Sequence, residues 1–569
     1  MLSAMPRRRA TSRLAALVAG LALGMSFGSG CHGDRPARHD IPADGPLDPA
    51  LEGVDDVVVR VMSQLCIGAG VLAIARDGEV VAARGYGFRD GPPSRECASR
   101  RDRFAGGATT LPDTPMRIGS VGKNIGAILV RRVLRDALAA EGLPADDAAI
   151  EALPLVGGPL RLLPPRIEET LLGPRAPAFA TGGDCDARAD PRWREVTIGH
   201  LLSHRAGLPG AGPDLLAGDR LQALRELWTR EALAAEQAAL MPPRRAIRQG
   251  PGRDGYFVAP PELAEGVLAL GSTCLRSDPG ARASYSNLGF DVLSLVAATV
   301  GGRLEVARGG DLESHDGSLL DAFLRDELGL AAGRASRHGI SLSHPYLEAR
   351  DPAEPRYRMW TPGRRTYYPE YDDPKRPYCI LQGDGRCTFD EWRERGRPVN
   401  YAWERERLPL SYEWIGAPVS TGLLAAEAPV LLEIVGRYWL GRVMPGGHDD
   451  GAPFYGRSRA LHQSPVNRQH GGNLAGATAW AGQFVGAPVD YAVVPLAAGS
   501  GRYDFAVATE SARCTAIPAG VDVVVAFNQS YSQDCHLDGE VCGAAYDLWR
   551  SLLVEALCEV DWDRVGGES

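Results

Sequence analysis

Lysine is almost absent from this sequence. Of the 62 lysines and arginines in 569 residues, only Lys123 and Lys375 are lysine. The net charge of -9 gives no reason to expect a nucleic-acid partner. Arginine cannot serve as a base because its pKa exceeds about 12, whereas a desolvated lysine can lose its proton. A lysine retained in such a chain is therefore a candidate for chemistry.

Lys123 follows Ser120 by three residues, and helix-compatible sequence comes next. If a helix begins at Ser120, the two side chains lie on one face, with the hydroxyl within reach of the amine. This is the arrangement of an activated nucleophile, and the alternative is a solvated helix lysine. A phosphate-binding loop is excluded, because Arg117 stands where its first glycine would be and Asn124 replaces the residue that would hold magnesium.

The N-terminus resembles an export signal. Residues 1–30 have a basic start, an apolar run and small residues before Cys31, as in a bacterial lipoprotein signal whose cysteine is lipidated. A plain secretory signal is the alternative, and the run is too short for an ordinary spanning helix. We expect residues 31–46 to be a flexible tether, with the protein exported to the cell envelope and held at a membrane by its lipid. The remaining ten of the 11 cysteines form an even set suited to disulfides in an oxidising compartment.

A single folded domain is expected over residues 47–560. Asp48 is a predicted N-cap, and Asp77-Gly78 between apolar runs predicts a β-hairpin. The helix from Ser120 should stop near Gly142. Close to the C-terminus, alternation predicts an antiparallel meander followed by an amphipathic helix. The expected ranges are 480–485, 490–496, 503–509 and 521–527 for the strands and 544–558 for the helix.

Two polar motifs lie in the middle of the chain. His200 and His204 are four apart and could bind a metal as a pair, but no glutamate follows the first histidine as in a zinc protease, so we favour structural roles. Tyr285 and Asn287 occupy a polar turn before an apolar helix, from which both could project into a cleft. The alternative is an ordinary turn with an asparagine cap.

An insertion is predicted at about 345–415, where aromatic residues are concentrated among arginines and prolines. It could be a lid over a substrate cleft, or a long insertion that needs its own aromatic and disulfide core, which we favour. Residues 446–451 could ligate a cation, but a solvent loop is the favoured interpretation.

Taken together, the motifs resemble the serine beta-lactamase-like hydrolases, in the branch of class C beta-lactamases, DD-peptidases and related esterases. The resemblance rests on blocks in the family's order, at 71–87, 120–123, 196–210, 285–287, 416–422 and 470–472. It implies an α+β fold, in which an antiparallel sheet flanked by the N- and C-terminal helices lies beside a mostly helical region, with the site between them.

The resemblance also implies roles for single residues. Ser120 would be the acylated nucleophile, and Lys123 would lower its proton affinity. Tyr285 would shuttle the proton between Ser120, the leaving group and water. Asn287 would hold Lys123 and the carbonyl side of the substrate. The family's mechanism needs no metal or organic cofactor.

A third motif would complete the site. His470 stands in place of the family's lysine, and Gly471 and Gly472 would let a strand run close to the substrate. The backbone N–H of Asn473 would join that of Ser120 as an oxyanion hole, at a helix N-terminus where the dipole favours negative charge.

The third motif also departs from the family pattern. Gly471 lacks the hydroxyl that helps many relatives bind a substrate carboxylate, and His470 carries less fixed charge than lysine, unless Arg468 or the insertion supplies it. We therefore expect an esterase or peptidase acting on a small-molecule or peptide substrate. The alternatives are a beta-lactamase or DD-carboxypeptidase proper, or a catalytically silent lipoprotein that keeps the fold as a binding module.

Overall fold

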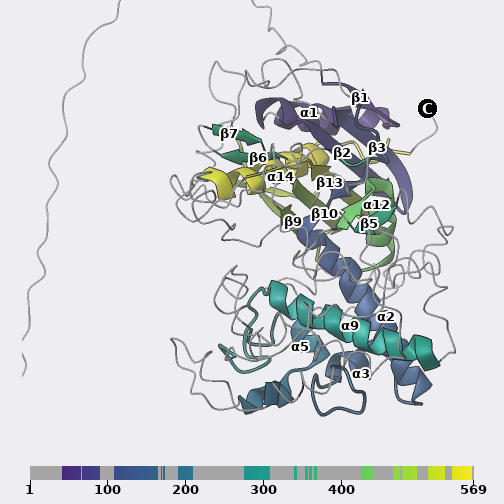
Figure 1. Ribbon diagram of the computed structural model, residues 1–569. Coiled ribbons are helices and arrows are strands. Elements are labelled where there is room, and N and C mark those ends of the chain that lie inside the picture. Colours follow the sequence, from purple (N-terminus) through teal and green to yellow (C-terminus); the bar gives the residue numbers. More distant parts are fainter. Residues whose placement is uncertain are drawn as a thin grey trace, which may run out of the picture. The chain divides into compact units, whose positions relative to one another are not determined.

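The structure, a computed structural model, describes part of the predicted domain, within one compact unit, His39–Ser569 (Figure 1). The predicted signal segment 1–30 and Cys31 lie outside the described residues. Among the helices of the described part, none combines the length and apolarity needed to cross a membrane. The described residues are 41–65, 67–89, 108–163, 168, 171–172, 190–208, 275–307, 339–342, 353–355, 358–361, 364–367, 424–440, 466–474, 477–495, 510–531 and 541–566.

A six-stranded antiparallel sheet is the centre of the fold. Its strands are β1 (Ala43–Asp44), β2 (Ala69–Arg76), β3 (Glu79–Gly87), β9 (Arg468–Leu474), β10 (Ala477–Val485) and β13 (Ala519–Phe527), in the order β1-β3-β2-β13-β10-β9. The predicted hairpin is confirmed as β2 and β3. Asp77 (φ 52°) and Gly78 (φ 85°) both have positive φ, which a two-residue turn of this kind requires.

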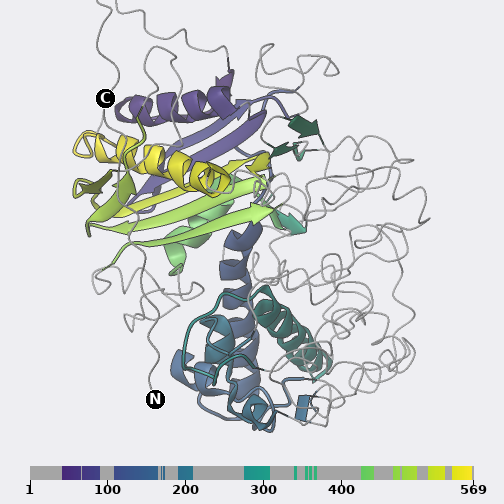
Figure 2. The same cartoon turned by 90° about the vertical axis from the view of Figure 1, so that its left-hand side faces the viewer.

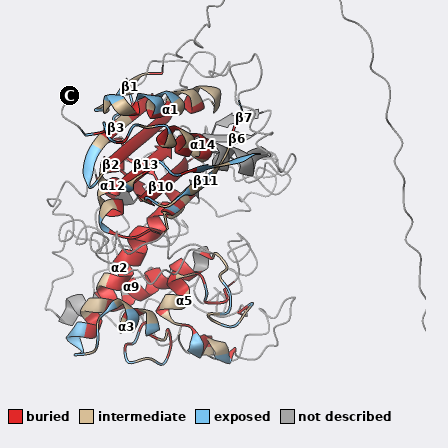
Figure 3. Ribbon diagram, turned by 180° about the vertical axis from the view of Figure 1, so that it is seen from behind, coloured by how far each residue is buried: buried red, intermediate tan, exposed pale blue. Residues whose placement is uncertain are grey.

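Both faces of the sheet are covered by helices. Successive residues of a strand point to opposite sides of the sheet, so each strand contributes side chains to two cores. Leu72 and Ile74 of β2 pack in one core with α1 (Glu52–Leu65) and α14 (Val541–Cys558), which contact each other. Val71 and Ala73 pack in the other core with α12 (Ala428–Arg437). Figure 3 shows the buried strands between these layers. The predicted α+β class, with a sheet flanked by N- and C-terminal helices, is confirmed.

The predicted C-terminal meander is wrong in its pairing. β11 (Val489–Ala492) and β12 (Ser511–Cys514) form a separate two-stranded sheet, whereas β13 pairs with both β10 and β2. Alternation shows which residues suit a strand but not which strand they pair with. The predicted strand at 503–509 lies outside the described residues. The predicted final helix is confirmed as α14, and the disulfide Cys514–Cys558 joins it to β12.

A helical region lies at the far end of α2 (Gly122–Ala140), as Figures 1 and 2 show. It contains α3 (Asp147–Ala152), α5 (Ile198–Leu202) and α9 (Asn287–Ala307), with contacts from α9 to both α2 and α5. Most apolar side chains of α2 are buried, and Gly142, which was predicted to stop the helix, follows its end with a φ of 68°. The helix does not start at Ser120, because a 3-10 turn, η2 (Gly119–Val121), precedes it.

Short strands support the turn before α2. β4 (Met116–Arg117) pairs with β8 (Leu424–Ala426), which also pairs with β5 (Ile340–Leu342). Arg117 forms a 3.2 Å ion pair with Glu354, and both side chains are almost completely buried. The start of the predicted insertion is therefore attached to the strand that leads to Ser120.

Within the rest of that insertion, β6 (Arg358–Thr361) and β7 (Arg364–Tyr367) form a hairpin, and β6 pairs in parallel with β14 (Gln529–Tyr531). The remainder of the insertion, the block at 416–422 and the loop at 446–451 lie outside the described residues.

Candidate active site

Ser120 lies in the turn that enters α2, with its side chain only partly buried. Gly119 has a φ of 52°, which suits glycine because it has no Cβ, and the Ile118 N–H donates to the Leu424 carbonyl at 2.9 Å. The turn therefore presents the hydroxyl at the N-terminal end of the helix, where the aligned peptide dipoles favour negative charge.

Lys123 lies on the same face as Ser120, as the spacing predicts. Its Nζ donates to Ser120 Oγ at 3.0 Å, and the side chain is fully buried. The amine is 5.2 Å from the centre of the Tyr285 ring and 5.8 Å from that of Phe290. The alternative of a solvated helix lysine is therefore wrong.

Tyr285 reaches Ser120 from a part of the chain 165 residues away. Its hydroxyl donates to Ser120 Oγ at 2.7 Å, so this oxygen accepts hydrogen bonds from two side chains. Burial raises the pKa of Tyr285 to about 12, and the hydrogen bond to Ser120 only partly opposes this shift. Tyr285 is therefore protonated at neutral pH.

The predicted third motif forms the edge strand β9 of the sheet. A Cβ at Gly472 would lie 1.9 Å from the Ile118 carbonyl oxygen and 2.9 Å from the Ser120 nitrogen. Only glycine permits so close an approach of two backbones. Gly471 is the preceding residue of the strand, and the backbone of Asn473 pairs with Thr478 of β10.

Asn287 is the first residue of α9, two residues after Tyr285, and its side chain lies outside the described residues. The same holds for the side chain of Asn473, whose predicted role uses only the backbone.

His470 is buried and neutral. Burial lowers its pKa to about 3. Nδ1 is 2.9 Å from the Gly471 carbonyl oxygen, which can only accept, so Nδ1 carries the proton. Nε2 is then an acceptor, and it has no hydrogen-bond partner within the described part of the chain.

Arg468 does not replace the missing lysine of the third motif. Its guanidinium is buried, donates to the Leu440 carbonyl at 3.2 Å and lies 4.7 Å from the centre of the Trp439 ring. The guanidinium of Arg468 thus packs β9 against the residues that follow α12.

Residues 54–308 match the family model described as Beta-lactamase. The chain has the beta-lactamase/transpeptidase-like fold. The matched segment contains Ser120, Lys123 and Tyr285, while the His470 strand lies beyond it. No curated protein sequence matches the chain.

Several solved structures are similar to this beta-lactamase-like chain. One is EstCE1, described as a hydrolase with promiscuous acyltransferase activity, with 16% identity, a TM-score of 0.41 and coverage of 90% of this chain and 98% of that one. A penicillin-binding protein homologue from Caulobacter crescentus has 15% identity, a TM-score of 0.38 and coverage of 92% and 100%. A beta-lactamase/D-alanine carboxypeptidase from Yersinia pestis has 14% identity, a TM-score of 0.37 and coverage of 90% and 99%.

In this beta-lactamase-like fold the two histidines of the 196–210 block have separate contacts. His200 Nδ1 accepts from the Thr197 N–H at 3.3 Å while Thr197 Oγ1 accepts from the His200 N–H, which caps α5. His204 instead contacts the Tyr285 turn, and its Nδ1 accepts from the Ser286 N–H at 3.1 Å. Their four-residue spacing carried no sign of this division. Among the described residues, no group of three or more histidines, cysteines or carboxylates could hold a metal.

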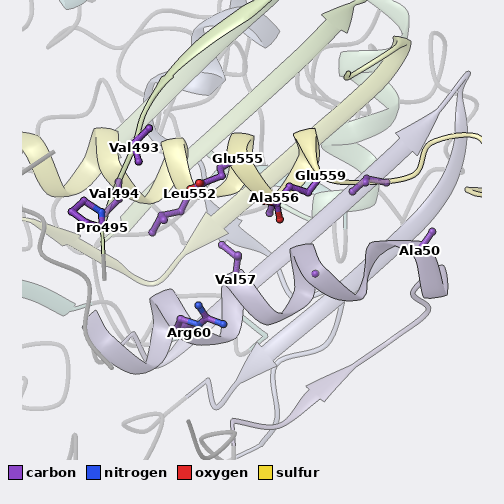
Figure 4. Close-up of a pocket in the computed structure, with 12 residues that line it drawn as sticks. Ala50, Val57, Arg60, Val493, Val494, Pro495, Leu552, Glu555, Ala556 and Glu559 are labelled. Atoms are coloured by element: carbon purple, nitrogen blue, oxygen red, sulfur yellow. The ribbon is translucent and has the colours of Figure 1, made fainter. Parts of the chain in front are cut away.

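A groove of about 580 Å³ lies between α1 and α14 (Figure 4). Its walls include Val57 and Arg60 from α1 and Leu552, Glu555 and Glu559 from α14. No predicted site residue lines it, so the groove is separate from the surroundings of Ser120.

Proposed function

We propose that this protein is a serine hydrolase that cleaves an ester or amide through an acyl-enzyme on Ser120. One observation carries the proposal: Ser120 Oγ accepts hydrogen bonds from both the buried Lys123 and Tyr285. In this arrangement Lys123 can act as a base for the Ser120 hydroxyl, and Tyr285 can act as a proton donor to the leaving group. Activation of a serine as a nucleophile requires such an adjacent base.

In the acylation step Ser120 Oγ attacks the substrate carbonyl carbon and its proton passes to Lys123, whose uncharged form is favoured by burial. The N–H groups of Ser120 and Asn473 stabilise the oxyanion. As the intermediate collapses, the bond to the leaving group breaks and Tyr285, protonated at rest, gives its proton to that group. Lys123 then gives the proton that it took from Ser120 to Tyr285, which is protonated again. Water then attacks the acyl-enzyme, its proton returning by the same route to Ser120.

We further propose that the substrate has no carboxylate next to the scissile bond. His470 is neutral, Gly471 has no hydroxyl, and Arg468 is held by Leu440 and Trp439. These three features favour an uncharged ester or amide over an anionic beta-lactam or peptide C-terminus. A peptide or small molecule with a neutral acyl group fits this description.

We also propose that the protein is exported and anchored by a lipid on Cys31. The signal-like sequence before Cys31 supports this, and so does the disulfide Cys514–Cys558, since disulfides persist in oxidising compartments. Metabolic labelling with a fatty-acid probe tests it. Wild type should be labelled and Cys31→Ser should not, whereas equal labelling of both would contradict the anchor.

The function itself is tested by intact-mass analysis of the full chain, purified in detergent, after exposure to a fluorophosphonate or to a penicillin. We expect a fluorophosphonate adduct on wild type and none on Ser120→Ala. Ser203→Ala is a matched control, because the Ser203 hydroxyl only donates to the Gly199 carbonyl within α5. A penicillin adduct would move the assignment to a beta-lactamase or DD-carboxypeptidase. Absence of both adducts would favour a silent binding lipoprotein.

A further inference from the structure

His204 holds the chain on both sides of Tyr285. Its carbonyl oxygen accepts from the Ser284 N–H at 2.8 Å, and its Nδ1 accepts from the Ser286 N–H at 3.1 Å. The residue is buried and has a φ of 57°, an uncommon backbone conformation in which histidine is enriched. A single strained residue thus fixes both neighbours of the tyrosine.

The His204 ring also packs on the tyrosine itself. The ring centres of His204 and Tyr285 are 4.5 Å apart, and the two ring planes are tilted by 34°. The Phe290 ring also packs on His204, with the two ring centres 5.2 Å apart. Since the Tyr285 hydroxyl is 2.7 Å from Ser120 Oγ, a small rotation of its ring would break this hydrogen bond.

Further backbone contacts make the His204 loop a rigid support. The Gly280 N–H donates to the Arg205 carbonyl at 2.8 Å, and the Arg276 N–H donates to the Gly207 carbonyl at 2.7 Å. Together with the hydrogen bond from Ser284, these contacts connect residues 204–207 to the segment 275–286.

We propose that His204 is a positioning residue that sets the Tyr285 hydroxyl against Ser120 and thereby controls the rate of acylation. The proposal rests on the proposed function, because it assumes that Tyr285 transfers a proton. Four contacts carry it: two hydrogen bonds that His204 accepts from the N–H groups on either side of the tyrosine, one through its carbonyl and one through its ring, and the ring contacts with Tyr285 and Phe290. A purely structural histidine would support the loop without changing the chemistry of Ser120.

The test uses His204→Asn. Asparagine tolerates the positive φ, and its Oδ1 can replace Nδ1 as the acceptor for Ser286, but it has no ring to hold Tyr285. We expect the rate of fluorophosphonate labelling and the kcat for an uncharged ester to fall about 10²-fold, as for a misplacement of about 1 Å, while KM changes little. His204→Phe, which keeps a ring and loses the acceptor, should also be slower. It provides the test if the first variant fails to fold.

A double-mutant cycle distinguishes positioning from general support. Tyr285→Phe alone should be slow, and adding His204→Asn should reduce the rate by less than about twofold more, because the hydroxyl that His204 orients is already gone. His200→Ala is the matched control. It removes a histidine from the same block whose ring caps α5 and has no ring contact with Tyr285 among those the structure describes, so it should lower stability and leave the rate unchanged.

The outcomes separate the two proposals. Wild-type protein that resists the fluorophosphonate would overturn the proposed function, and the role of His204 with it. Reactive wild type combined with normal rates in folded His204→Asn would overturn only the positioning role. The positioning role would also be overturned if the rate losses of Tyr285→Phe and His204→Asn were additive in the double variant.

Discussion

Replacing Gly472 by alanine should damage the chemistry of Ser120 more than the stability of the fold. The added Cβ would lie 1.9 Å from the Ile118 carbonyl oxygen, whereas Cβ atoms essentially never approach closer than 3.0 Å. The atom in its way is backbone, so strand β9 or the Ser120 turn must move by about 1 Å.

The size of the effect follows from which atoms move. The same Cβ would be 2.9 Å from the Ser120 nitrogen, so the shift separates the two proposed oxyanion donors, the N–H groups of Ser120 and Asn473. Loss of one such donor typically lowers kcat about 10²- to 10³-fold. Overpacking typically costs about 1–3 kcal/mol, so we expect a folded protein.

Steady-state hydrolysis of an uncharged ester gives kcat, and denaturant unfolding gives the stability. Gly53→Ala is the control, because a Cβ there meets nothing within 4 Å and alanine favours the helix α1. It should leave kcat unchanged and raise stability slightly. If folded Gly472→Ala keeps a wild-type kcat, the reasoning about this close approach is refuted.

Three further predictions concern stability. Glu354→Gln should lower the free energy of unfolding by about 3–5 kcal/mol in denaturant titrations, because it removes one charge of the buried ion pair with Arg117. For His470 the pKa is about 3 in the folded chain and 6.5 as the ordinary value, so only the unfolded chain gains this proton as pH falls between them. As the pH falls from 6.5 toward 3, His470 should therefore lower the free energy of unfolding by about 1.4 kcal/mol per pH unit. His470→Asn should remove this contribution to the pH dependence of stability. Replacing Cys514 and Cys558 by serine should lower stability by about 2–4 kcal/mol, which unfolding under non-reducing conditions would reveal.

Local features of the fold were predictable from the sequence because short-range geometry determines them. The Asp77-Gly78 turn requires positive φ at both positions, and Asp48 caps the first turn by accepting from the Ala50 N–H. The Ser120–Lys123 pair follows in the same way, since residues three apart on a helix are neighbours. The 3-10 turn before α2 changed the predicted boundary without separating the two side chains.

Strand pairing and the full site depended on long-range packing. Alternation marked β10 and β13 as strands, but whether β13 would pair with β2 depended on which hydrophobic faces close the two cores. The neutral state of His470 likewise depends on burial by distant residues.

By itself, the sequence determined that the hydroxyl of Ser120 and the amine of Lys123 would be neighbours, because both residues lie within one helical turn. Only the tertiary structure brought Tyr285 to Ser120 across 165 residues, placed Gly472 against the same turn and assigned His204 to the tyrosine. The physical reason is that contacts between distant segments depend on how whole elements pack, and no periodicity within a segment records its partners.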